Sequence, residues 1–209
     1  MKKILLSLFV LGIYTISFAQ YENILISNTS GPNEPSICMD PKNPMHIVAG
    51  ANTDKYFISS DGGYSWYPGT LTSPGFLVWG DPCIIVDTAG DFYFFHLSYE
   101  QGGPWIDRIY GQKFDFDTET WSDGSYMGKN GSKAQDKEWA VVDSANNNIY
   151  VTWTQFDEYG TPDPTKFSNI MFSKSVDAGE TWSPAQQINE VSGNCIDSDN
   201  TTEGAVPAV

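Results

Sequence analysis

The chain has 209 residues, which is long enough for a domain with a sizeable buried core. It carries 26 acidic and 11 basic residues, a formal net charge of −15, and this balance argues against binding to nucleic acid or any other polyanion. The 19 glycines, 12 prolines and 14% aromatic residues are typical of many short strands that are joined by turns.

The N-terminus has the pattern of a secretory signal peptide. Lys2 and Lys3 precede an apolar run over residues 4–18, which the small residue Ala19 follows. The run is short for a membrane span, and no later segment is apolar enough to cross a bilayer. We therefore expect a signal peptide over residues 1–19 with cleavage after Ala19, a secreted or cell-surface protein, and no membrane span.

Three segments repeat along the rest of the chain. Residues 34–40, 81–87 and 137–143 align without gaps, and each is a short apolar stretch that ends at Asp. A polar turn and a second apolar stretch follow each segment, then a third stretch, then a hairpin that ends in Trp. The second stretches are residues 46–51, 92–98 and 149–154; the third are 56–59, 108–114 and 169–173; the tryptophans are Trp66, Trp121 and Trp182. With a weaker strand after each Trp, every unit contains about four antiparallel strands.

Four-stranded units that recur at intervals of about 50 residues indicate the blades of a β-propeller. We predict an all-β fold over residues 20–209, with blades at 34–80, 81–136 and 137–202 and the start of another at 203–209. Because propellers close with about four to eight blades, we expect the sequence to be the N-terminal part of a protein with six or more. A short chain that closes by oligomerising is the alternative.

The hairpins at residues 59–66 and 175–182 share the pattern Ser-x-Asp-x-Gly-x-(Ser/Thr)-Trp. Each residue type suits a tight turn: Asp accepts backbone N–H groups, Gly permits a positive φ, and Trp buries an apolar face against the sheet. The middle unit keeps only Thr120 and Trp121 of the pattern. We assign a structural role to Ser59, Asp61, Gly63, Trp66, Ser175, Asp177, Gly179, Thr181 and Trp182.

This pattern resembles the Asp box, or bacterial neuraminidase repeat (BNR), of the sialidase superfamily. Residues 30–209 as a whole, including the stretches 34–37 and 136–143, resemble secreted bacterial sialidase-like glycosyl hydrolases. The resemblance implies a propeller in which the boxes are structural and the ligand binds at the opposite end of the blades. Strand alternation brings the links between blades and the loops between second and third strands to that end.

Many charged and aromatic residues fall at this end. The links contain Asn33, Glu34, Trp79, Asp81, Asp136, Lys137 and Glu138, and the loops contain Asn52, Asp54, Lys55, Tyr99, Glu100, Trp105, Asp107, Arg108, Asp157, Glu158 and Tyr159. The ligand-face candidates are Glu34, Lys55, Trp79, Asp81, Trp105, Arg108, Lys137 and Glu138. Aromatic rings beside carboxylates suit sugar binding, whereas the simpler interpretation is that Trp79 and Trp105 fill gaps between blades.

The resemblance also implies a catalytic set: three arginines that bind the sialic acid carboxylate, a Tyr–Glu nucleophile and an Asp acid/base. Arg108 is the only arginine here, and Asn33 falls where the family has the arginine of an Arg-Ile-Pro segment. Asp54 is the nearest match to the acid/base, and we name it as the candidate catalytic residue. The sequence thus favours a propeller that binds extracellular glycans or glycoproteins, or cleaves them as an exo-glycosidase with a non-standard site. The alternative is a non-catalytic propeller for adhesion or protein binding.

No cofactor is required by either function. The acidic starts of the first strands, at Glu34, Asp81 and Glu203, could line a central channel and bind calcium. The simpler interpretation is that these are solvated carboxylates in loops.

Overall fold

The computed structural model of the chain describes residues 22–29, 31–196 and 200–209. This part of the chain contains β-strands and no helix, so no helix in it could cross a membrane. The predicted signal peptide lies outside the described residues. The all-β fold class is confirmed.

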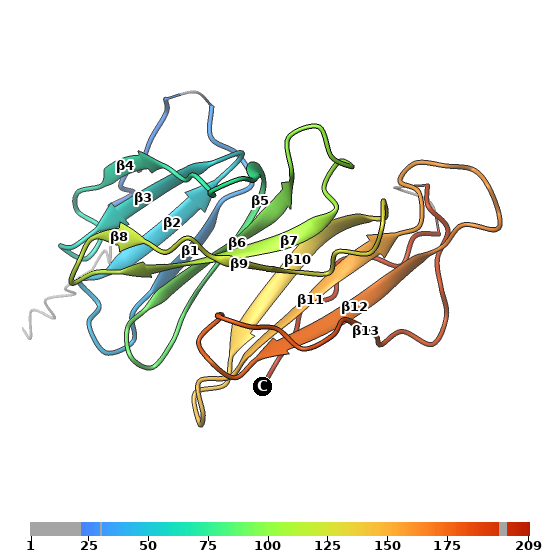
Figure 1. Cartoon of the computed structure of the whole chain (residues 1–209). Helices are drawn as coiled ribbons and strands as arrows, with labels where there is room; N and C mark the ends of the chain where they lie inside the picture. Colours follow the sequence, from blue (N-terminus) through green and yellow to red (C-terminus); the bar gives the residue numbers. More distant parts are fainter. Residues whose placement is uncertain (1–21, 30, 197–199) are drawn as a thin grey trace, which may run out of the picture.

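The strands form three antiparallel sheets that follow one another along the chain (Figure 1). The first sheet contains β1 (Ser36–Met39), β2 (Ile47–Ala51), β3 (Lys55–Ser59) and β4 (Tyr67–Thr70), in that order. The second contains β5 (Leu77–Val86), β6 (Phe92–Tyr99), β7 (Arg108–Asp115) and β8 (Thr120–Trp121), and β9 (Ser125–Met127) also pairs with β7. The third contains β10 (Ala134–Val142), β11 (Ile149–Phe156), β12 (Ser168–Ser175) and β13 (Gln186–Gln187). These sheets have the strand order and antiparallel pairing of propeller blades, and we call them blades 1, 2 and 3.

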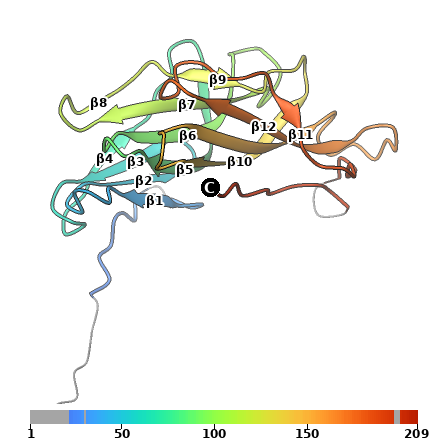
Figure 2. The same cartoon turned by 90° about the horizontal axis from the view of Figure 1, so that it is seen from below.

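The first strands of the three blades, β1, β5 and β10, lie side by side (Figure 2). Side chains connect each one to the backbone of the next. Ser36 Oγ accepts the Ile84 N–H at 2.9 Å, and Cys83 Sγ accepts the Ala140 N–H at 3.4 Å. The same register position is used both times, so the repeat in the sequence becomes a repeat in the packing between blades.

Two of these strands begin earlier than we expected. β5 starts at Leu77 and β10 at Ala134, before the predicted starts at Asp81 and Lys137. The polar, proline-containing stretch at 80–82 suggested a link between blades, but the strand continues through it by means of a bulge. Residues 203–209, predicted to open another blade, form no strand; Thr152 of β11 donates a hydrogen bond to Ala205 O at 2.7 Å.

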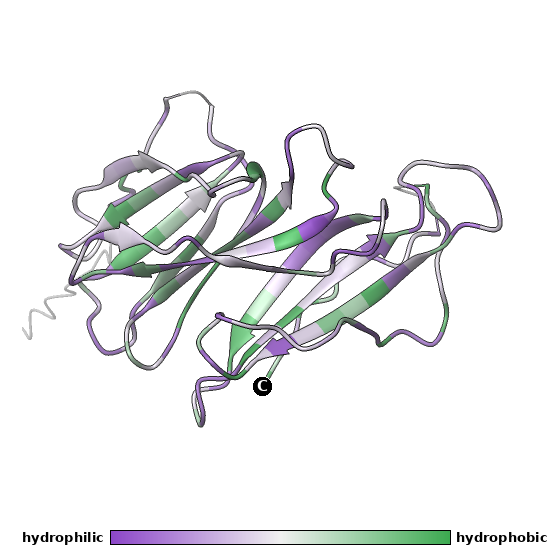
Figure 3. Ribbon diagram, viewed as in Figure 1, coloured by the Kyte–Doolittle hydropathy of each residue, from purple (hydrophilic) through white to green (hydrophobic). Residues whose placement is uncertain are grey.

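The core lies between the blades. One cluster joins blades 1 and 2 and contains Val48, Ile84, Phe92, Phe94 and Phe114. A larger cluster joins blades 2 and 3 and is centred on the fully buried Phe95 and Trp153. Apolar positions recur along the strands of all three sheets (Figure 3). Since β6 has a blade on each side, seven of its eight residues are buried, and its apolar run shows no alternation.

The two repeated hairpins, which we call the Ser–Asp turns (59–66 and 175–182), have the same internal hydrogen bonds. In the first turn Ser59 Oγ accepts the Gly63 N–H at 2.8 Å, and Asp61 Oδ1 accepts the Ser65 N–H at 2.9 Å. In the second, the equivalent distances from Gly179 to Ser175 and from Thr181 to Asp177 are both 2.9 Å.

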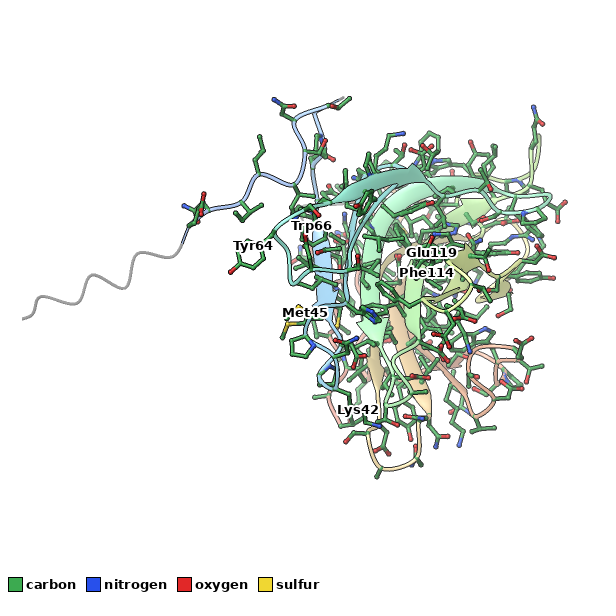
Figure 4. The ribbon with its side chains drawn as sticks, turned by 90° about the vertical axis from the view of Figure 1, so that its left-hand side faces the viewer. Lys42, Met45, Tyr64, Trp66, Phe114 and Glu119 are labelled. Carbon is green, nitrogen blue, oxygen red and sulfur yellow. The ribbon has the colours of Figure 1, made fainter. Side chains whose placement is uncertain are left out.

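The Asp carboxylate of each Ser–Asp turn therefore accepts its hydrogen bonds from residues of the same turn. Hydrogen bonds from the Ser65 hydroxyl and backbone lower the pKa of Asp61 to about 2, and those from Thr181 do the same for Asp177. Tyr64 at the tip of the first turn points away from the sheet, on the side where Met45 of the β1–β2 turn also lies (Figure 4). Gly62 N–H donates to Met45 O at 3.0 Å, so both turns occupy one end of the blade.

Candidate functional site

The opposite end of the blades carries a repeated β-bulge. In β5, Gly80 pairs with Leu97 and Cys83 with Phe95, so two residues, Asp81 and Pro82, lie opposite one. β10 has the same irregularity between Asp136 and Trp139, which places Lys137 and Glu138 at the bulge.

Blade 1 repeats this arrangement just before β1. Ser36 pairs with Gly50, and the Asn52 N–H donates to Asn33 O at 3.0 Å, so Glu34 and Pro35 lie opposite Ala51 alone. The three bulges occupy the same register in the three blades.

The first residue of every bulge is in the left-handed region of backbone conformation. The φ angles are 49° at Glu34, 54° at Asp81 and 52° at Lys137. Such a conformation costs a non-glycine residue on the order of 1–3 kcal/mol, and bulges of this kind redirect side chains beside binding sites. Because β1, β5 and β10 are neighbours, the three charged side chains meet.

They meet at a pocket of about 220 Å³, which we call the bulge pocket. Its lining residues all come from the three bulges or directly follow one: Glu34, Pro35, Asp81, Pro82, Lys137, Glu138 and Trp139. Four of the eight ligand-face candidates, Glu34, Asp81, Lys137 and Glu138, are thus brought together by the structure.

Hydrogen bonds and an ion pair connect the three bulges. Asn52 donates from Nδ2 to Glu34 Oε2 at 2.8 Å, and its Oδ1 accepts the Asp81 N–H at 2.7 Å. Lys137 Nζ then contacts Asp81 Oδ2 at 2.8 Å. Gly80 is required here, because a Cβ at this position would lie 2.3 Å from Asn52 Oδ1. The pocket wall is therefore a single network across all three blades.

Glu138 is the exception within the repeat, since the other two bulges have Pro35 and Pro82 at its position. Glu138 is 3% exposed, and neither of its carboxyl oxygens has a hydrogen-bond partner within residues 22–29, 31–196 and 200–209. Burial raises the pKa of Glu138 well above its usual value, and the charges of Asp81 and Asp136 raise it further. Burial thus favours the neutral, protonated form of the Glu138 carboxyl group. A buried polar group without a partner costs about 1–3 kcal/mol and is rare enough to need an explanation.

Asp136, one residue before the bulge, is also perturbed. Burial raises its pKa to about 7, and the nearby Asp81 carboxylate acts in the same direction. Lys137 opposes the shift, and its backbone N–H donates to Asp136 Oδ1 at 2.9 Å. Burial disfavours the charged form of Lys137, yet its bond to Asp81 raises the Lys137 pKa above the ordinary value, so the ammonium stays charged. The site thus holds neutral and ionised groups side by side.

A row of aromatic rings lies at the same end of blades 2 and 3. Trp79 directly precedes Gly80 on β5, Trp105 is in the β6–β7 loop, and Tyr159 is in the β11–β12 loop. The ring centroids of Trp79 and Trp105 are 6.1 Å apart, and those of Trp105 and Tyr159 are 5.4 Å apart. These residues, which we call the aromatic row, are 42%, 42% and 37% exposed. Trp79 and Trp105 therefore present surface to solvent as well as contacting each other.

The remaining candidates lie away from the bulge pocket. Arg108 is 1% exposed, and its guanidinium binds Asp107 Oδ1 at 2.7 Å and Glu100 Oε1 at 3.1 Å. Its carbon lies 4.5 Å and 4.7 Å from the ring centroids of Phe76 and Tyr126. The single arginine of the chain is thus fully engaged by its own neighbours.

Asp54 is in the β2–β3 loop and forms an ion pair with Lys55 at 2.8 Å. Neither side chain lines the bulge pocket. The catalytic role of Asp54 stays a prediction.

In the described ranges, no group of three or more His, Cys, Asp or Glu side chains is arranged to hold a metal ion. The calcium site remains a prediction from the acidic strand starts. Sequence reasoning missed the bulges themselves and the place of Trp139 in the pocket wall. The available signal was the alignment of Glu34-Pro35, Asp81-Pro82 and Lys137-Glu138, in which only the third pair lacks proline.

Comparison with known proteins adds evidence on the fold. No family model and no curated protein matches the sequence. Among solved structures, the polysaccharide lyase Uly1 is similar with a TM-score of 0.50 and 11% identity, over 73% of this chain and 42% of that one. A β-1,3-galactosidase of glycoside hydrolase family 43 has a TM-score of 0.48 and 10% identity, over 78% of this chain and 32% of that one. The Hadza microbial sialidase Hz136 has a TM-score of 0.41 and 13% identity, over 69% of this chain and 35% of that one.

This chain spans less than half the length of each of these three structures. At such low identity the likeness concerns the fold alone.

Proposed function

We propose that this chain is a secreted, sialidase-like propeller that binds extracellular glycans and cleaves them at the bulge pocket. The observation that carries the proposal is the threefold bulge, which brings Glu34, Asp81 and Lys137 to one pocket beside an exposed aromatic row. The resemblance of the Ser–Asp turns to Asp boxes supports it, as does the likeness of the fold to that of a polysaccharide lyase. Sequencing the N-terminus of the mature protein tests secretion, with Gln20 as the expected first residue.

The pocket contains the two kinds of carboxyl group that glycoside hydrolysis requires. Glu138 borders the pocket, and burial favours its protonated form, so it is the proposed proton donor to the leaving sugar oxygen. Asp81, which contacts the Lys137 ammonium at 2.8 Å, is the proposed carboxylate that accepts a proton from water. One carboxyl group that donates a proton and a second that activates water are the usual arrangement for this reaction.

The test uses the full-length protein, a glycan array and a panel of aryl glycosides. Glu138→Gln keeps the shape of the side chain and removes the acid, so turnover should fall about 100-fold or more. Glu119→Gln is the matched control, because Glu119 is exposed in the β7–β8 turn at the other end of blade 2 and its loss should leave turnover unchanged. Turnover by the Glu138→Gln variant at the wild-type rate would refute this assignment, and a protein that neither binds nor cleaves any glycan would refute the proposed function.

A non-catalytic propeller for adhesion is the second candidate, and the environment of Arg108 favours it. A clamp for the carboxylate of sialic acid needs free guanidinium groups, whereas the only arginine is buried between Asp107 and Glu100. Under this alternative the array shows binding, no aryl glycoside is hydrolysed, and Glu138→Gln binds as the wild type does.

A further inference from the structure

The aromatic row has features that the chemistry of the bulge pocket does not explain. Exposed Trp and Tyr side chains on a soluble protein are expected singly, whereas here Trp105 contacts both Trp79 and Tyr159. A fourth ring, that of half-buried Tyr99, lies 5.7 Å from Trp79. These rings come from four separate segments of blades 2 and 3, so the fold, and not a local apolar stretch, assembles them.

The row starts at the pocket and leads away from it. Trp79 is two residues before Asp81 on β5, so one end of the row lies beside the bulge of blade 2. Trp105 and Tyr159 are in loops that follow the second strands of their blades, further from the first strands. Because Trp105 contacts both Trp79 and Tyr159, the order along the row from the β5 bulge is Trp79, Trp105, Tyr159.

The two loops are held in place by buried neighbours. After Trp105, the side chains of Ile106, Asp107 and Arg108 are at most 1% exposed, and Ile106 O accepts the Gln135 N–H of β10 at 2.8 Å. The ring of Tyr159 packs 4.9 Å from that of the buried Phe156. The row is thus preformed, and a ligand does not have to order it.

The charges around the row disfavour an anionic ligand. Three lysines at this end are already paired with carboxylates: Lys129 with Asp107, Lys133 with Asp157 at 2.7 Å, and Lys137 with Asp81. Glu158 and Asp163, both exposed in the β11–β12 loop that carries Tyr159, add negative charge. Lys166 of that loop is in none of the ion pairs among the described residues, and the loop also contains Asp157. A carboxylated or sulfated sugar would therefore meet one unpaired lysine among several carboxylates, which disfavours its binding.

We propose that Trp79, Trp105 and Tyr159 are consecutive subsites for a linear, uncharged glycan chain that extends outward from the bulge pocket. This inference rests on the proposed function and specifies its substrate class as a polymer and not a single terminal sugar. Ring centroids 5.4 Å and 6.1 Å apart provide about one ring for each sugar unit. The planes of neighbouring rings differ by 90° and 80°, so the three rings do not form one flat platform. This arrangement fits a soluble, twisted glycan chain and does not fit the flat surface of a crystalline polysaccharide.

The experiment measures affinity against chain length by calorimetry on the full-length protein. The probes are neutral xylo-, manno-, galacto- and arabino-oligosaccharides of two to six units, with oligogalacturonates of the same lengths as anionic comparators. For the neutral series that binds, affinity should rise with each unit until the row is covered. Trp105→Ala and Tyr159→Ala should each weaken hexasaccharide binding about 10-fold or more and leave disaccharide binding unchanged.

Tyr64→Ala is the matched control, since Tyr64 is 78% exposed at the opposite end of blade 1. It should bind every probe as the wild type does, and equal melting temperatures for the three variants exclude misfolding. Glycan binding that is independent of length, or that Trp105→Ala and Tyr64→Ala affect equally, overturns the subsites and leaves the proposed function intact. Tighter binding of oligogalacturonate, or no binding of any neutral probe, overturns the uncharged polymer as substrate class, and the proposed function is overturned only if the glycan array and the aryl glycosides are negative as well.

Discussion

The two ends of the blades use carboxylates in opposite ways. In the Ser–Asp turns, Asp61 and Asp177 accept hydrogen bonds from their own loops, and their pKa values fall to about 2. At the bulge end, burial raises the pKa of Asp136 to about 7, and neither carboxyl oxygen of Glu138 has a hydrogen-bond partner among the described residues. The carboxylates of the Ser–Asp turns are therefore satisfied by hydrogen bonds, whereas the other end has a buried carboxyl group without a partner among the described residues, at a cost in stability.

This difference teaches where to look for function in a repeating structure. Both ends are built from the same repeat, and both include acidic residues at fixed positions. What separates them is whether the polar groups are already paired within the chain. The predictions below test that contrast, from the largest expected change in stability to the smallest.

Trp182→Ala should lower the free energy of unfolding by about 3 kcal/mol. Trp182 packs 5.8 Å from the ring of Phe95 in the core, and its Nε1 donates to Ser125 Oγ of blade 2 at 2.7 Å, so it joins two blades. Trp66→Ala is the matched control and should cost less, because Trp66 Nε1 donates only to Gly63 O of its own turn. Urea unfolding of both variants measures the difference, and equal losses would show that the turns act independently of the packing between blades.

Asp136→Asn should stabilise the protein by about 2 kcal/mol at pH 8 and change little at pH 4. The pKa of Asp136 is about 7 in the folded state and about 3.9 in the unfolded chain, so the folded protein binds the extra proton. The stability from this group is fully present below about pH 4 and is lost as the pH rises to about 7. Asparagine keeps the oxygen that accepts the Lys137 N–H and removes the charge beside Asp81 and Glu203.

The measurement is thermal unfolding of the wild type and the Asp136→Asn variant across this pH range. Buried His96, whose pKa burial lowers to about 4, gives the opposite slope between about pH 4 and 6.5. Its contribution cancels in the difference between the two proteins. A difference that does not depend on pH would mean that Asp136 ionises normally.

Glu138→Pro should stabilise the protein by about 1 kcal/mol at neutral pH and abolish any turnover. The substitution restores the residue that Pro35 and Pro82 provide in the other two bulges, and the preceding residue already has the same φ in all three. Chemical denaturation measures the gain. A large loss of stability would show that Glu138 has a structural partner in solution and would weaken the contrast between the two ends.

The sequence predicted the blades because their signals are local. Apolar stretches, glycines and the Ser–Asp pattern specify strands and turns within a few residues, and the observed strands lie close to the expected ranges. The bulge pocket is different, because its side chains come from positions about 50 residues apart and meet only through the register between blades. Burial and pairing decide the chemistry of these side chains. No sequence pattern shows that Arg108 is enclosed by Asp107 and Glu100, or that both oxygens of Glu138 lack a partner in the described part of the chain.

Asp54→Asn should have the smallest effect on stability, within about 0.5 kcal/mol, because the Asp54–Lys55 pair is about one-third exposed on both sides. The Asp54→Asn variant is more informative about activity. The family resemblance implies Asp54 as the acid/base, whereas the environment of the bulge pocket favours Glu138. Turnover of an aryl glycoside by Asp54→Asn and Glu138→Gln, each with its pH profile, separates the two. If only Glu138→Gln is inactive, Glu138 in the bulge of blade 3 is the acid of the reaction. If only Asp54→Asn is inactive, the acid/base is Asp54 in the β2–β3 loop, as the resemblance to sialidases implies. The bulge pocket then only binds the ligand.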